Sequence, residues 1–176
     1  MEPDVKDTKQ RILATARLAV QARGYNGLSF RELAAAIGIK SASIHHHFPT
    51  KGDLGGVLAQ RYTADFAEYL DGLLAAGLDL DTCVRKYADV FRTTLCNENR
   101  MCLGGILAAE HEELPAKVRA EVVKFSEMNV AWLARVLSAG KRTKAGDDSF
   151  QKKALAVFAA IEGAQLVARC RNDVSV

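Results

Sequence analysis

The sequence has little proline and no long apolar run, and both absences limit the classes of protein it can encode. It contains three proline residues among 176 and no tract rich in glycine and serine, which argues against disordered linkers. The longest apolar runs, such as 154–161, are too short to cross a bilayer. The beginning of the chain, MEPDVKDTKQR, is polar and lacks the apolar segment of a secretory signal. These features predict a cytoplasmic protein.

Motifs of common enzymes are also missing. The sequence has no nucleophile elbow, no P-loop and no GxGxxG at a strand–helix junction. A di-iron bundle needs Glu-x-x-His pairs, but the residues three before the four histidines are Ala42, Ser43, Ile44 and Ala108. No segment alternates polar and apolar residues with the period of two that a β-strand requires. We therefore expect an all-α protein that is not an enzyme and has no cofactor.

Cysteine is scarce and shows no CxxC pair. The four residues are Cys83, Cys96, Cys102 and Cys170, and in a reducing compartment they are expected to be free thiols that are partly buried. Cys96 and Cys102 flank the short segment NENRM, which is typical of a turn. A redox-responsive regulator that uses Cys96 and Cys102 is therefore one alternative function.

Residues 29–38 predict a short amphipathic helix with clear ends. Ser29 and Glu32 have the spacing of a capping box. Gly38 can adopt the left-handed conformation that ends a helix. Four apolar residues recur at the spacing of one buried helical face: Phe30, Leu33, Ala34 and Ile37.

A second short helix, 41–48, carries polar side chains where a core helix would carry apolar ones. Only Ile44 and Phe48 are spaced to be buried, and Pro49 ends the helix. Small, hydroxyl and imidazole groups cover the rest of its surface, and such groups can reach base edges in the major groove of DNA. The pair of helices predicts a helix-turn-helix, although the second helix could also simply face solvent.

Three consecutive histidines, His45, His46 and His47, lie on this second helix. Successive helical residues point about 100° apart, so the three cannot converge on one metal ion. Contact with phosphate is the better interpretation, because imidazole donates hydrogen bonds and becomes cationic near neutrality. Residues 1–55 hold eight Lys and Arg against five acidic residues, which accounts for the entire net charge of +3. This placement favours a nucleic-acid partner.

The remaining pattern is helical throughout and predicts two parts. Residues 1–50 form a DNA-binding unit of three helices, and residues 51–176 form an effector-binding and dimerisation bundle. We expect Gly24 to end the first helix. Gly140 is expected to end the helix at 115–139, and a basic loop at 141–146 follows it. The expected helices outside the helix-turn-helix cover 7–23, 50–76, 79–95, 103–110, 115–139 and 148–170.

Several segments together resemble the tetracycline-repressor (TetR/AcrR) family of bacterial one-component regulators. They are RILATA at 11–16, RGY at 23–25, FRELAAAIGI at 30–39 and SIHHHFPTKGDL at 43–54. The resemblance implies a homodimeric repressor that binds a near-palindromic operator in double-stranded DNA and is released by a small molecule. An activator would differ only in the position of its operator. The other alternative is a helical ligand-binding protein without DNA binding.

The resemblance also implies roles for residues of the helix-turn-helix. The base-contacting candidates are Ser41, Ala42, Ser43 and His46. The phosphate-contacting candidates are Ser29, Arg31, His45, His47 and Lys51.

Two positions depart from the family pattern. His45 stands where the family commonly has Tyr, so we expect operator binding to weaken more steeply between about pH 6 and 8 than in relatives with Tyr. Lys40 stands where the family commonly has Ser or Thr, so the cap of the second helix is expected to shift to Ser41.

The effector is expected inside the bundle, among apolar and aromatic side chains at inward helical positions. Glu110, His111 and Glu162 are the polar side chains of interest there, and the mostly apolar composition indicates a hydrophobic or aromatic ligand. The pocket candidates are Phe66, Tyr69, Tyr87, Phe91, Leu103, Ile106, Leu107, Phe125, Met128, Trp132, Phe158 and Glu162.

Dimerisation is expected to use the helices at 116–139 and 148–170, where Gly163 and Ala164 would allow close approach. The family usually has one more helix after this point. We therefore expect either that the last helix takes over part of the interface or that the sequence is part of a longer chain.

Overall fold

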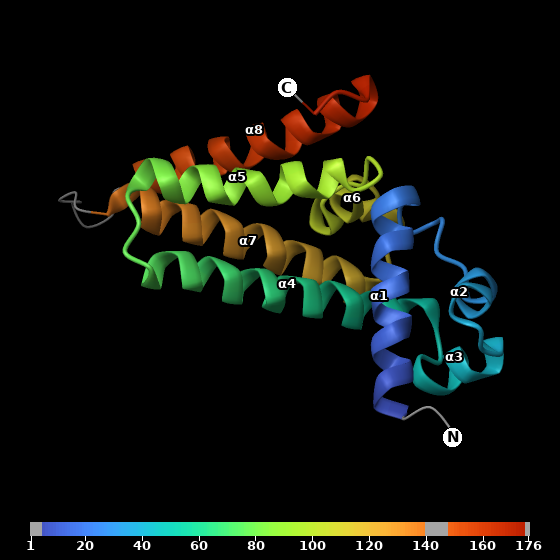
Figure 1. The fold of residues 1–176 in the computed structure, drawn as a ribbon. Coiled ribbons are helices and arrows are strands. Elements are labelled where there is room, and N and C mark those ends of the chain that lie inside the picture. Colours follow the sequence, from blue (N-terminus) through green and yellow to red (C-terminus); the bar gives the residue numbers. More distant parts are fainter. Residues whose placement is uncertain (1–4, 140–147, 175–176) are drawn as a thin grey trace. The chain divides into compact units, whose positions relative to one another are not determined.

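The structure, a computed structural model, describes residues 5–139 and 148–174, and the regular secondary structure in these residues is helical. Within these residues there is no strand, and the predicted all-α fold is confirmed (Figure 1). The expected end of a helix at Gly140 and the basic loop at 141–146 lie outside the described residues. The elements are α1 (Val5–Arg23), α2 (Phe30–Ile37), α3 (Ser41–His47), α4 (Lys51–Ala75), α5 (Leu80–Cys96), α6 (Leu103–Ala109), the 3-10 turn η1 (His111–Glu113), α7 (Ala116–Ser138) and α8 (Ser149–Arg171).

The chain forms two compact units whose boundaries were not expected. The first unit contains the residues up to Tyr62 together with Leu103–Val122, and the second contains Thr63–Cys102 and the residues from Val123 onward. Helix α6 belongs with the N-terminal helices because it packs against α1. The functional division into residues 1–50 and 51–176 stays a prediction, because the compact units are defined by which residues pack together and not by what the residues do.

A continuous apolar core holds the first unit together. Its α1 stripe, which includes Ile12, Ala16 and Val20, is fully buried. Ile44 of α3 and Leu54 of α4 are also fully buried. Burying one such side chain contributes about 1.5–3 kcal/mol, so α3 is fixed to the unit even though it has only seven residues.

Glycines in the left-handed region end the first two helices, as predicted. Gly24 has φ of 78° and donates its N–H to the carbonyl of Val20. Gly38 has φ of 71°, and its N–H group caps α2. Any other residue at these positions would strain the backbone.

The helix starts agree with the sequence only in part. The Ser29 hydroxyl accepts from the N–H of Glu32 at 3.4 Å, but the Glu32 carboxylate pairs with Arg23 at 2.7 Å and does not complete a capping box. The expected cap at Ser41 is wrong. Ser41 already lies inside α3, and Lys40 occupies the N-cap position in extended conformation without a side-chain cap.

A complete capping box that was not predicted begins α4. The N–H of Thr50 donates to the Asp53 carboxylate at 3.0 Å, and the N–H of Asp53 donates to the Thr50 hydroxyl at 3.1 Å. This reciprocal pair satisfies two backbone donors that a helix start would otherwise leave open.

The second unit is a bundle in which α5 lies alongside α8 (Figure 1). The indole N–H of Trp132 in α7 donates to the carbonyl of Leu70 in α4 at 2.9 Å, which connects those two helices. The buried hydroxyl of Tyr87 donates to the side-chain oxygen of Asn129 at 2.7 Å. Both bonds satisfy polar atoms inside an aromatic core, where an unpaired atom would be costly.

Candidate nucleic-acid interface and effector site

Helix α3 presents its polar side chains outward, as its sequence pattern predicted. Ile44 and Phe48 are 0% and 2% exposed. Ala42, His45 and His46 are exposed on the other side of the helix, and Ser43 is half-buried. The apolar pair therefore anchors the helix while it leaves a surface of small groups and imidazoles available for contact.

The three histidines have different surroundings. The His45 ring packs edge-on against Phe30 with 4.8 Å between ring centroids, and its Nδ1 lies 3.4 Å from the carbonyl oxygen of Pro49. His46 is exposed and packs edge-on against His47. Burial lowers the pKa of His47, and the nearby His46 and Lys9 lower it further. In the free protein these surroundings therefore disfavour the cationic form of His47, whereas a nearby phosphate would favour it.

Several cations of this unit take part in its folding. The Arg11 guanidinium donates to the carbonyl of Ile37 at 2.6 Å, which satisfies the end of α2. The Lys51 ammonium lies 4.5 Å from the centroid of the Tyr25 ring and 3.4 Å from the carbonyl oxygen of Asn26. Burial lowers the pKa of Lys51. Of the two other phosphate candidates, Ser29 caps α2 with its side chain, and Arg31 is exposed to solvent.

The α6–α7 segment supports the loop between α1 and α2. The backbone N–H of Tyr25 donates to the Glu110 carboxylate at 2.6 Å. A Cβ added to Gly24 would meet the same carboxyl group, so a larger residue there would displace the Glu110 side chain as well as strain the backbone at positive φ. Asn26 donates to Glu113, and Lys117 pairs with Asp53. Glu110 and His111 were expected in the effector pocket. Instead, Glu110 supports the first unit and the half-exposed His111 pairs with Glu112.

The aromatic candidates for the effector site cluster in the second unit. Phe66 packs within 6.2 Å, between ring centroids, of Tyr69, Tyr87, Phe91 and Phe125. The expectation that all twelve candidates point inward is wrong for Tyr69, which is 40% exposed and donates its hydroxyl to the carbonyl of Lys86 at 3.3 Å. Three candidates belong to the first unit and the other nine to the second. The three are Leu103, Ile106 and Leu107.

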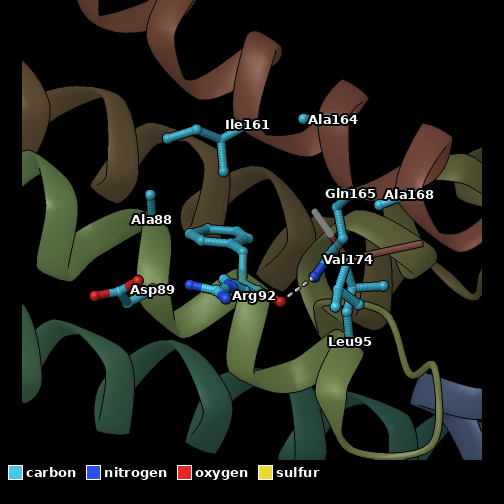
Figure 2. Close-up of a pocket in the computed structure, with 10 residues that line it drawn as sticks. Ala88, Asp89, Arg92, Leu95, Ile161, Ala164, Gln165, Ala168 and Val174 are labelled. Atoms are coloured by element: carbon cyan, nitrogen blue, oxygen red, sulfur yellow. Dashed lines mark hydrogen bonds between the residues drawn. The ribbon is translucent and has the colours of Figure 1, made fainter. Parts of the chain in front are cut away.

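A groove of about 170 Å³ lies between α5 and α8 (Figure 2). Among the expected pocket residues only Phe91 lines it. Gln165, which sequence reasoning missed, forms part of its wall and donates to the carbonyl of Phe91 at 2.9 Å. Glutamine gave no signal because a single amide on an apolar helix has no spacing that identifies it.

The cysteines that frame the NENRM turn differ in exposure. Cys96 is exposed and Cys102 is 1% exposed. The turn itself is present, with Glu98 and Asn99 in the left-handed region. Neither thiol forms a disulfide in the part of the chain that the structure describes, and the redox alternative stays a prediction.

Comparison with known proteins identifies the family. The sequence profile of "Bacterial regulatory proteins, tetR family" matches residues 12–55. The crystal structure of a TetR transcriptional regulator from Legionella pneumophila is 35% identical, with a TM-score of 0.90 over 99% of this chain and 92% of the other. This chain belongs to the TetR family.

Two further relatives agree with this assignment. A TetR-family regulator from Agrobacterium tumefaciens is 28% identical, with a TM-score of 0.88 over 98% of this chain and 92% of that one. The HTH-type transcriptional repressor NemR of Escherichia coli is 26% identical over 77% of this chain and 69% of its own length. The crystal structure of its reduced form has a TM-score of 0.80, at 25% identity over 96% and 90% of the two chains.

The protein is therefore a DNA-binding transcriptional regulator. Members of the family are generally not enzymes. None of the helices in the described part of the chain is long and apolar enough to span a membrane.

Proposed function

We propose that this regulator is a homodimeric repressor that binds a near-palindromic operator and leaves it when a small apolar or aromatic effector binds. The observation that carries the proposal is the arrangement of α3. The buried Ile44 and Phe48 fix the helix, while Ala42, His45 and His46 remain exposed on its outer side. A rigid helix with small polar groups on its free surface suits the major groove.

Within α3 we assign base contacts to Ser41, Ala42, Ser43 and His46. Ser29, Arg31, His45, His47 and Lys51 are assigned to phosphates. Phosphate contacts should position the protein without distinguishing sequences, while loss of a base contact should relax specificity. His46 is the most informative of the base-side group, because its side chain is exposed and large enough to reach a base edge.

Selection of bound fragments from a genomic library, followed by gel shift, tests the proposal. We expect sequence-specific binding whose affinity falls steeply with salt. The His46→Ala variant should lose about 1–3 kcal/mol of specific binding, and its affinity for unrelated DNA should change little. His111→Ala is the matched control, because it removes a half-exposed histidine that lies outside α3. Absence of any specific fragment would refute the proposal and favour a helical ligand-binding protein without DNA binding.

The dimer is assigned mainly to α8, which has apolar residues on more than one side. Ala154 and Phe158 are buried within the protomer. Leu155, Leu166 and Val167 are 47–54% exposed on the rest of the helix. A Cβ added to Gly163 would meet nothing within 4 Å, so this part of the surface is open. Apolar surface of this kind favours a second subunit that would cover it.

A further inference from the structure

Glu162 is a buried carboxyl group whose oxygens have no hydrogen-bond partner among the described residues. It lies on α8, one helical turn from the buried Phe158 and near the buried Gln165. Burial raises the pKa of Glu162 to about 7, and the neighbouring Cys102 thiol partly opposes this effect. Buried carboxyl groups normally have partners, since an unpaired one is costly. The position of Glu162 therefore needs an explanation.

The polar groups around Glu162 already have other partners. Tyr87, whose own pKa is raised by burial and by the proximity of Cys102 and Glu162, donates its hydroxyl proton to Asn129. The backbone N–H of Cys102 donates to Gln165, and the amide of Gln165 donates to Phe91. These bonds leave the Glu162 oxygens unpaired, and the Cys102 thiol is a weak donor close enough to lower the pKa of Glu162.

Aromatic rings surround the same region. The Tyr87 ring lies 5.4 Å from Trp132 and 5.2 Å from Phe91, between ring centroids. Ring faces attract cations, most strongly when the cation is desolvated. A buried carboxyl group beside several aromatic rings is a suitable environment for a desolvated cation with an apolar body.

The groove between α5 and α8 adjoins this region. Phe91 and Gln165 line the groove. The Phe91 ring also packs against Tyr87, and Gln165 accepts from the backbone N–H of Cys102. Its volume of about 170 Å³ suits a ligand with a single aromatic ring. Glu162 does not line the groove itself, and the charged side chains in the groove wall are Asp89 and Arg92.

We propose that Glu162 selects an effector that combines an apolar or aromatic body with a protonated amine. The ammonium group donates to the carboxylate that the protein leaves without a partner, and the aromatic rings hold the apolar body. This inference rests on the proposed function and specifies its effector class. A neutral analogue would leave the carboxyl group unpaired, and an anionic one would be repelled by it.

Calorimetric titration of the 176-residue chain tests this assignment with 2-phenylethylamine, 2-phenylethanol and 3-phenylpropanoate as probes. At about pH 8 the amine should bind at least about tenfold more tightly than the alcohol, and the carboxylate should bind most weakly. Glu162→Gln, which keeps the shape of the side chain, should remove this preference. Glu127→Gln changes an exposed carboxylate on α7 and should leave the preference intact.

Proton release gives a second measurement that a structural role for Glu162 would not affect. Below about pH 7 the amine must displace the proton of Glu162, so binding should release protons at pH 6 and almost none at pH 8.5. The release should be absent in Glu162→Gln. Failure of the amine to bind, equal affinity for the alcohol, or a preference that survives in Glu162→Gln would overturn the inference. Operator gel shift on the same preparation without probes separates this result from failure of the proposed function.

Discussion

Replacement of Glu162 by glutamine should stabilise the free protein in a pH-dependent way. The pKa of Glu162 is raised from its ordinary 4.5 to about 7 in the folded state. Below the unfolded pKa both states hold the proton, and the group does not affect folding. As the pH rises past 4.5, the carboxyl group ionises in the unfolded chain but stays protonated in the folded protein, so the free energy of unfolding falls. The loss is complete above about pH 7, where the group is ionised in both states. The full difference corresponds to roughly 3 kcal/mol.

Urea denaturation at fixed protein concentration measures this difference. We compare the unfolding free energy of Glu162→Gln with that of the parent at each pH. The difference, variant minus parent, should be up to roughly 3 kcal/mol larger at pH 8.5 than at pH 4. The comparison between pH values matters more than the value at one pH, because the new amide has a burial cost of its own that does not change with pH. A difference between variant and parent that is the same at pH 4 and pH 8.5 would refute the reasoning.

Three other substitutions test separate parts of the structure. Leu166→Asp places a charge on the exposed apolar side of α8 and should convert the proposed dimer to a monomer in light scattering. An unchanged mass of a dimer would show that α8 is not part of the interface. Tyr87→Phe leaves the buried oxygen of Asn129 without its donor and should cost about 1–3 kcal/mol in urea denaturation; no loss would contradict the importance of that bond. Glu110→Ala leaves the buried N–H of Tyr25 unpaired and should cost a similar amount, about 1–3 kcal/mol, while Glu110→Gln keeps an oxygen acceptor and should cost less. Equal losses in the two Glu110 variants would show that the acceptor is unimportant.

Local chemistry explains why much of the fold could be predicted. Gly24 and Gly38 end helices because only glycine adopts positive φ without strain, and this property is visible in the sequence. The four-residue spacing of Ile44 and Phe48 was enough to predict which side of α3 is buried. The cap of α3 was predicted wrongly. A serine favours the N-cap position on average, but here the helix begins one residue earlier, and Lys40 needs no side-chain bond to occupy that position.

Contacts distant in sequence could not be predicted. The bond from Tyr25 to Glu110 joins residues 85 positions apart, and nothing in either local pattern indicates the other. For the same reason the sequence could not predict the hydrogen bonds that join Gln165 to the backbone of Cys102 and Phe91. Aromatic periodicity predicted the core around Tyr87, but it could not show that Tyr69 would turn partly outward to reach a backbone carbonyl.

The position of Glu110 also changes how the two functional parts can communicate. The residues from Leu103 to Val122 belong to the predicted effector-binding part, yet they pack within the same compact unit as α1, α2 and α3. Glu110 holds the backbone at Tyr25, and Lys117 pairs with Asp53 at the start of α4. A displacement of α6 or the start of α7 would therefore act directly on the loop before α2 and on the helix that follows α3. Because buried backbone donors tolerate little loss of their acceptor, we expect a shift of Glu110 to disturb the loop that carries Tyr25 and leads into α2.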